Sequence, residues 1–215
     1  NSEGLPGLLL QLQYMRTGRR DIFFAAEAMA RHVRDVDIRH DGMWFGRGTR
    51  HGVQHWSDGN HEERQTIHSE FRFIHYLTGD LRSRDVAQKL TDRIYTKGKI
   101  RIHAAHSGRL YGLLTRWEMT GDKKLGEMLR RYVHCFIVPE GIAESPSVEF
   151  PMAATYDKPE NINSGGMFFN CFGAMHTLLE YYYLTEDREL RDAIIRMADE
   201  ALRRKAKPGL LRKSL

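Results

Sequence analysis

The sequence predicts an all-α fold of the α/α-toroid type on three observations. An apolar helical stretch, a short turn with a threonine and a charged amphipathic helix follow one another four times along the 215 residues. The turns combine glycine, which ends a helix in the left-handed conformation, with aspartate, which caps the free amides of the next helix. The first helix of each pair is apolar around much of its circumference, whereas the second has one apolar stripe. This asymmetry favours an inner ring wrapped by an outer ring over a solenoid, whose helices would be more evenly amphipathic.

The four hairpins follow in chain order within one domain that covers residues 1–205. We expect them at residues 2–35, 64–97, 102–138 and 164–205. Their turns are Thr17-Gly18, Thr78-Gly79-Asp80, Thr120-Gly121-Asp122 and Thr185-Glu186-Asp187. The first helices contain the apolar stretches LLLQL, FRFIHYL, GLLTRW and TLLEYYYL, and the second helices include DVAQKLTDRIY and ELRDAIIRMADEALRRK. Residues 206–215 form a basic tail.

Two connections between hairpins carry insertions, at residues 36–63 and 139–163. In an all-helical repeat array such insertions usually gather on one face, which is often where ligand binds. Because the tight turns are expected to close one end of the barrel, we expect the insertions and the N-termini of the inner helices at the other end. The free amides and the positive dipole ends of those helices would then meet at one rim. A cleft with convergent polar side chains is predicted there.

The segment HGVQHWSDGNHEERQTIHSE places four of the eleven histidines of the chain at this rim. His68 lies nearest the rim on its helix, whereas His75 is interpreted as a packing histidine. On the next inner helix His106 and Arg109 are expected to contact a ligand, or else to brace the helix ends by hydrogen bonding. The predicted rim residues, in chain order, are Arg50, His51, His55, Trp56, His68, His103, His106, Arg109, Tyr156 and Asn163.

Metal binding is the rival interpretation of the histidine cluster. The HExxH and CxxC spacings of zinc sites are absent, and glycine and serine residues disfavour the helix on which His51 and His55 would share a face. His55, Asp58 and His61 form a reserve set for zinc. The DGN run offers oxygen ligands for calcium but lacks the other positions of an EF-hand. The predicted site requires no cofactor, with zinc or calcium as the open alternative.

The residue types at the rim suit an acidic sugar. Trp56 offers a stacking platform for a sugar face, and Arg50 and Arg109 offer paired hydrogen bonds to a sugar carboxylate. His68, His106 or Tyr156 would take the proton next to that carboxylate, which is the demanding step when a lyase cleaves a uronate polymer. A polysaccharide lyase is therefore the leading hypothesis.

Two alternatives stay open. A glycoside hydrolase would need two carboxyl groups about 5–9.5 Å apart, and the candidates are Glu62 or Glu70 with Asp58. The chain would otherwise be a noncatalytic toroid fragment that binds glycan or packs against another domain. No GxSxG, P-loop or dinucleotide-binding motif is present, so serine-hydrolase and nucleotide chemistry have no support.

The net charge and residue composition limit the kinds of partner that the chain is expected to bind. A net charge of +5 and a pI near 9.2 favour an anionic ligand such as an acidic polysaccharide or oligosaccharide. No basic run interleaved with aromatic residues indicates nucleic acid, and no apolar run of about eighteen residues indicates a membrane span. The two cysteines form no disulfide framework. The chain starts without methionine or a signal-peptide pattern, so secreted, periplasmic and cytoplasmic locations all stay open.

Several stretches resemble the C-terminal α/α-toroid domain of the exo-rhamnogalacturonan lyase and YetA-like family of carbohydrate-active proteins. They are EAMARHVRDVDIRH, FRFIHYLTGD, GRLYGLLTRWEMTGD and NSGGMFFNCFGAMHTLLEYYYLTED. The resemblance runs along nearly the whole chain and implies a pectin-type substrate, in a cleft shared with neighbouring domains of a longer chain. A complete six-hairpin toroid of this type has about six hairpins, so the four predicted here indicate a partial toroid.

Overall fold

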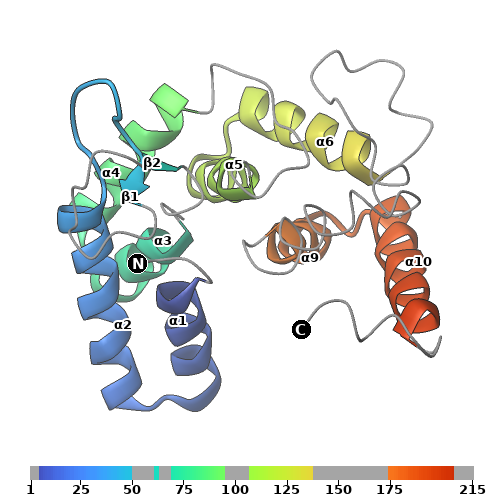
Figure 1. The fold of residues 1–215 in the computed structure, drawn as a ribbon, viewed down its shortest axis with the longest axis horizontal. Coiled ribbons are helices and arrows are strands. Elements are labelled where there is room, and N and C mark those ends of the chain that lie inside the picture. The colour runs from blue at the N-terminus through green and yellow to red at the C-terminus, as the bar shows by residue number, and fades with distance from the viewer. Residues whose placement is uncertain (1–4, 50–60, 63–68, 95–106, 138–173, 206–215) are drawn as a thin grey trace.

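The computed structural model describes residues 5–49, 61–62, 69–94, 107–137 and 174–205 (Figure 1). The helices are α1 (Pro6–Thr17), α2 (Arg20–His32), the π-helix η1 (Val33–Asp37), α3 (Ser69–Thr78), α4 (Leu81–Ile94), α5 (Ser107–Thr120), α6 (Lys123–Ile137), α9 (Ala174–Thr185) and α10 (Arg188–Lys205). Two short strands, β1 (Gly48–Thr49) and β2 (His61–Glu62), complete the described elements. The predicted all-α class is confirmed. No helix in the described ranges is long and apolar enough to cross a membrane.

The tight turn inside each hairpin is closed by a recurring set of hydrogen bonds. The threonine hydroxyl donates to the carbonyl four residues earlier, at 2.6–2.7 Å in all four turns. The next residue donates its amide to the carbonyl four residues before it, at 2.7–2.8 Å. In the last three turns Asp80, Asp122 and Asp187 accept a backbone amide of the following helix at 2.8–3.0 Å. The predicted aspartate caps are confirmed, because these bonds satisfy amides that a helix start leaves free.

The helices form an inner and an outer set, as predicted. The inner helices α1, α3, α5 and α9 contact one another in chain order, and α2, α4, α6 and α10 lie at the periphery (Figure 1). On α5, Leu110, Tyr111, Leu113 and Leu114 all have 0% exposed surface. Gly112 is buried as well, and five successive positions point around the whole circumference of a helix, so the middle of α5 is surrounded by protein.

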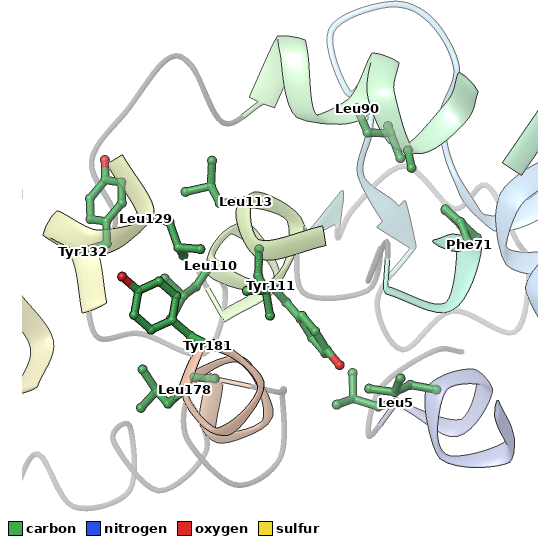
Figure 2. Close-up of a cluster of buried hydrophobic side chains, with 14 of the residues drawn as sticks. Leu5, Phe71, Leu90, Leu110, Tyr111, Leu113, Leu129, Tyr132, Leu178 and Tyr181 are labelled. Atoms are coloured by element: carbon green, nitrogen blue, oxygen red, sulfur yellow. The ribbon is translucent and has the colours of Figure 1, made fainter. Parts of the chain in front are cut away.

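The hydrophobic core is one cluster that joins the inner helices to the outer ones. Figure 2 shows Leu129 of α6 beside Leu110 of α5, with Leu178 and Tyr181 of α9 close by. The rings of Trp117 on α5 and Tyr181 on α9 lie 5.8 Å apart between centroids. Apolar burial between layers is the main force that holds such hairpins together, because a single hairpin cannot cover its own apolar face.

The first insertion starts from η1, which runs alongside α3. Arg34 of η1 is 4% exposed and pairs with Asp80 in the α3–α4 turn, and it also donates to Ser83 at 2.9 Å. After η1, residues 38–48 form a tight loop that we call the arch. Its neck is closed by the bridge between Ile38 and Gly48 and by two backbone bonds between residues 39 and 46–47. The arch is the loop beside α4 in Figure 1.

Candidate functional site

The N-terminal ends of α1 and α3 meet at the predicted rim. Gly7 in the first turn of α1 lies against the carboxyl group of Glu70 in the first turn of α3. A Cβ atom built on Gly7 would lie 1.6 Å from Glu70 Oε2 and 2.8 Å from its Cδ. No side chain fits at such a distance, so glycine is required at position 7 for this packing. Two inner-helix N-termini therefore lie side by side.

Glu70 is buried at this junction, with 4% of its surface exposed. Burial raises the pKa of its carboxyl group to about 8, and the charge of Asp37 on η1 adds to the increase. Burial favours the neutral form because an apolar environment replaces the water that would solvate the charge. At neutral pH Glu70 therefore holds its proton, and its carboxyl group is a hydrogen-bond donor as well as an acceptor.

The first insertion leaves the toroid at this same junction. The charge of Asp37 at the end of η1 acts on Glu70 at the start of α3, whereas Arg34, three residues earlier, pairs with Asp80 beyond the other end of α3. The insertion therefore begins at the N-terminal end of α3, which agrees with the predicted rim. π-Helical turns of the η1 type are frequent at functional sites.

A two-stranded antiparallel ladder pairs the residues before the histidine-rich segment with residues inside it. Gly48 of β1 pairs with Glu62 of β2, and Thr49 pairs with His61. The ladder packs on η1 through β1. Residues 49 and 61, which flank positions 50–60 in the sequence, are thus paired with each other.

A second polar cluster, the inner clasp, connects α3, α5 and α9. It consists of Arg72 on α3, Tyr111 and Glu118 on α5, and Glu180 on α9. Arg72 is 2% exposed and forms ion pairs with both Glu118 and Glu180, while the Tyr111 hydroxyl donates to Glu180. The Arg72 guanidinium also stacks near Phe73, with its Cζ 4.6 Å from the ring centroid. One buried cation thus bridges three inner helices.

The electrostatics of the inner clasp favour a charged guanidinium. Burial by itself would lower the pKa of Arg72, but Glu180, Tyr111 and Glu118 outweigh that effect and raise it. The nearby Tyr76 has a raised pKa, mainly through burial and then through the charge of Glu118. An ion pair that satisfies its charges internally is better suited to hold helices in place than to transfer a proton.

Sequence reasoning missed the carboxylates and the tyrosine of the inner clasp. A signal was present, because Glu118 and Glu180 are acidic residues inside otherwise apolar inner helices. Arg72 is the buried charge, and a buried charge needs partners, which these two carboxylates on neighbouring inner helices supply. The pairing could not be predicted, because these residues lie far apart in the sequence.

Most of the predicted rim residues lie outside the described ranges. These are Arg50, His51, His55, Trp56, Asp58, His68, His103, His106, Tyr156 and Asn163. Arg109 lies in the first turn of α5, and His61 and Glu62 form strand β2. His75 is half-buried, with Nδ1 3.2 Å from the carbonyl oxygen of Asp80, which confirms its interpretation as a packing histidine.

The reserve metal set of His55, Asp58 and His61 stays a prediction, since two of its three members fall outside the described ranges. Within those ranges no three histidine, cysteine or acidic side chains come together as metal ligands.

Comparison with known proteins gives two matches. The family model described as the PcRGLX-like protein C-terminal alpha/alpha toroid domain matches residues 1–207. The curated protein named "Uncharacterized protein YetA" from Bacillus subtilis (strain 168) is 29% identical over 231 residues, which cover 96% of this chain. The match covers 27% of the length of that relative. The predicted resemblance and the toroid fold are both confirmed by these matches.

Proposed function

Because the chain belongs to the PcRGLX-like C-terminal alpha/alpha toroid family, we propose that it is the toroid part of an enzyme that cleaves uronate-containing polysaccharide by β-elimination. The rhamnogalacturonan class of pectin is the proposed substrate. The observation that carries the proposal is the origin of the first insertion at the N-terminal end of α3. The place where this insertion begins supports the proposal that histidine, arginine and tryptophan side chains gather at one rim of the toroid.

The proposed reaction needs three kinds of group. Arg50 and Arg109 would bind the uronate carboxylate and stabilise the negative charge that develops when the adjacent proton leaves. His68 or His106 would take that proton, and Tyr156 would donate one to the departing glycosidic oxygen. The carbon–oxygen bond breaks as a carbon–carbon double bond forms, so an unsaturated uronate is produced without water being consumed. Trp56 would hold a sugar ring by stacking.

The net charge of the chain supports an acidic substrate. A charge of +5 would attract a polyuronate to the surface before it enters the cleft. The attraction would weaken at high ionic strength, since salt screens exposed charges over about 8–10 Å. Neighbouring domains of a longer chain are proposed to complete the cleft, because this chain spans 27% of the length of the relative it matches.

The test is absorbance near 235 nm while the protein at its natural length is incubated with rhamnogalacturonan and other polyuronates. A rise would report the unsaturated uronate. We expect His68→Ala or His106→Ala to lower kcat by roughly 10²–10⁴-fold, the usual contribution of a general base. His75→Ala is the matched control and should keep kcat, because His75 packs against the α3–α4 turn. A parallel series with EDTA tests the reserve metal set.

A glycoside hydrolase is the second candidate, favoured by the protonated state of Glu70. A general acid must hold its proton at the working pH, and the pKa of Glu70 is raised to about 8. New reducing ends without a rise at 235 nm, lost in Glu70→Gln, would support hydrolysis. The absence of both products for every polyuronate would leave a noncatalytic binding or structural domain and contradict the proposed function.

A further inference from the structure

The arch carries a second set of groups suited to an acidic sugar. Trp44 and Arg47 stack on each other, with the Arg47 Cζ 5.2 Å from the centroid of the Trp44 ring. Lys89 on α4 approaches Phe45 of the arch, with Nζ 5.2 Å from the ring centroid. Two neighbouring aromatic residues of the arch thus each lie next to a cation, Trp44 next to Arg47 and Phe45 next to Lys89. This combination suits a ligand with a ring and a negative charge.

The arch is held as a rigid unit by its own backbone. Arg39 donates its amide to the carbonyl of Arg47 at 3.1 Å, and Gly46 donates to the carbonyl of Arg39 at 2.7 Å. The amide of Arg47 in turn donates to the carbonyl of Trp44 at 3.1 Å. A loop closed in this way loses little conformational entropy when it binds a ligand, which favours affinity.

The arch is also anchored to the body of the protein. Phe45 is 5% exposed and belongs to the hydrophobic core cluster. The neighbouring tip residue Met43 is 83% exposed, whereas Trp44 and Arg47 are half-buried. A buried anchor beside an open tip keeps the Trp44 and Arg47 side chains at a defined position on the surface.

We infer that the arch is a sugar-binding subsite in which Arg47 pairs with a uronate carboxylate while Trp44 contacts the sugar ring and Lys89 supplies a second positive charge. The inference rests on the proposed function, because that function identifies the anionic ring as a uronate. The subsite lies on the arch and on α4. Its role is substrate binding and not bond cleavage.

The experiment measures binding separately from turnover. Calorimetric titration of the protein at its natural length with a galacturonate oligosaccharide gives Kd, and absorbance near 235 nm gives kcat. We expect Arg47→Gln to weaken binding roughly tenfold, because a hydrogen bond to a charged group is lost. Trp44→Ala should weaken it by a similar factor. Arg47→Lys should recover only part of the loss, since lysine keeps the charge but not the planar pair of donors.

Two control variants show whether weaker binding comes from the arch itself or from the loss of any surface arginine or aromatic ring. Arg31→Ala removes an exposed arginine that pairs with Glu27 on α2, and Tyr183→Ala removes an aromatic ring that is 75% exposed on α9. Both should bind the oligosaccharide as the unaltered protein does. A neutral galactan oligosaccharide of equal length should bind weakly to every variant, since it has no carboxylate for Arg47.

The outcomes distinguish the subsite from the proposed function. Weaker binding in Arg47→Gln and Trp44→Ala, with no turnover by any variant, would support the subsite and contradict the lyase. Turnover with unchanged Kd in both variants would contradict the subsite and leave the lyase intact. Failure of the unaltered protein to bind any uronate oligosaccharide would overturn the subsite. The melting temperature of each variant shows whether it is folded, and Trp44→Phe, which keeps an aromatic ring, replaces Trp44→Ala if that variant unfolds.

Discussion

At Glu70 a carboxyl group is enclosed between two helix starts and kept from water. The close approach of Gly7 leaves no room for solvent on that side, and Asp37 adds a negative charge nearby. Both effects disfavour ionisation, so the pKa rises to about 8. At a pH below the pKa of an unfolded glutamate, near 4.5, Glu70 is protonated in both the folded and the unfolded chain. Its burial then does not lower the free energy of unfolding through ionisation. Between that value and 8 only the unfolded chain releases the proton, so stability falls as pH rises.

Glu70→Gln should remove this pH dependence. We expect the free energy of unfolding of the variant, minus that of the unaltered protein, to increase between pH 5 and pH 8 by up to about 1.4 kcal/mol per pH unit. Urea unfolding at several pH values measures it. Glu127→Gln, which alters an exposed glutamate beside Arg130, is the control and should follow the profile of the unaltered protein. Parallel profiles for Glu70→Gln would show that Glu70 ionises normally in the folded state.

At the scale of the elements, three of the four tight turns have glycine after the threonine, whereas the fourth has Glu186. The residue after the threonine takes a left-handed conformation in every turn, with φ of 65° at Gly18, 73° at Gly79, 64° at Gly121 and 53° at Glu186. Glycine adopts this conformation freely, whereas a residue with a Cβ pays a steric cost. The fourth turn therefore carries strain that the other three avoid.

Glu186→Gly should stabilise the protein by about 0.5–1 kcal/mol, since relief of the strain exceeds the entropy that glycine adds to the unfolded chain. Gly121→Ala should destabilise it by about 1 kcal/mol. A Cβ atom at Gly121 would meet no atom within 4 Å, so the loss reports backbone conformation alone. Urea unfolding of both variants gives the two values. A destabilising Glu186→Gly would show that the glutamate side chain itself stabilises the turn.

Across the whole molecule, the inner clasp joins three helices that are far apart in the sequence. Arg72, Glu118 and Glu180 bring one buried cation and two partly exposed carboxylates together between these helices. Breaking a buried ion pair by removing one partner leaves the other charge without compensation. The inner clasp thus makes the positions of α3, α5 and α9 depend on one another.

Arg72→Met should destabilise the protein by about 1–3 kcal/mol, because Glu118 and Glu180, which water still reaches in part, would lose the hydrogen bonds of their cation. Adding Glu180→Gln to this variant should recover part of the loss. Arg84→Met is the matched control, because Arg84 pairs with Asp85 at the surface, and it should cost less than about 1 kcal/mol. Equal losses for Arg72→Met and Arg84→Met in urea unfolding would show that the inner clasp adds no more than a surface pair.

The hairpins and their caps followed from local sequence, because the atoms involved are four residues apart or fewer. Thr78, Gly79 and Asp80 make the same bonds in the structure that their order in the sequence predicts. The packing role of His75 also followed, since its partner is five residues away. Hydrophobic periodicity likewise predicted which helices are surrounded and which are peripheral.

The sequence by itself determined the helical hairpins, their turns, their division into inner and outer helices, and the family resemblance. Each of these features follows from local sequence patterns that are shorter than one hairpin repeat. Only the tertiary structure decided that Glu70 meets Gly7 and keeps its proton, that Arg72 bridges Glu118 and Glu180, and that Lys89 lies next to Phe45 of the arch. These contacts join residues tens of positions apart. Their burial and electrostatics depend on how the hairpins pack, which no local pattern encodes.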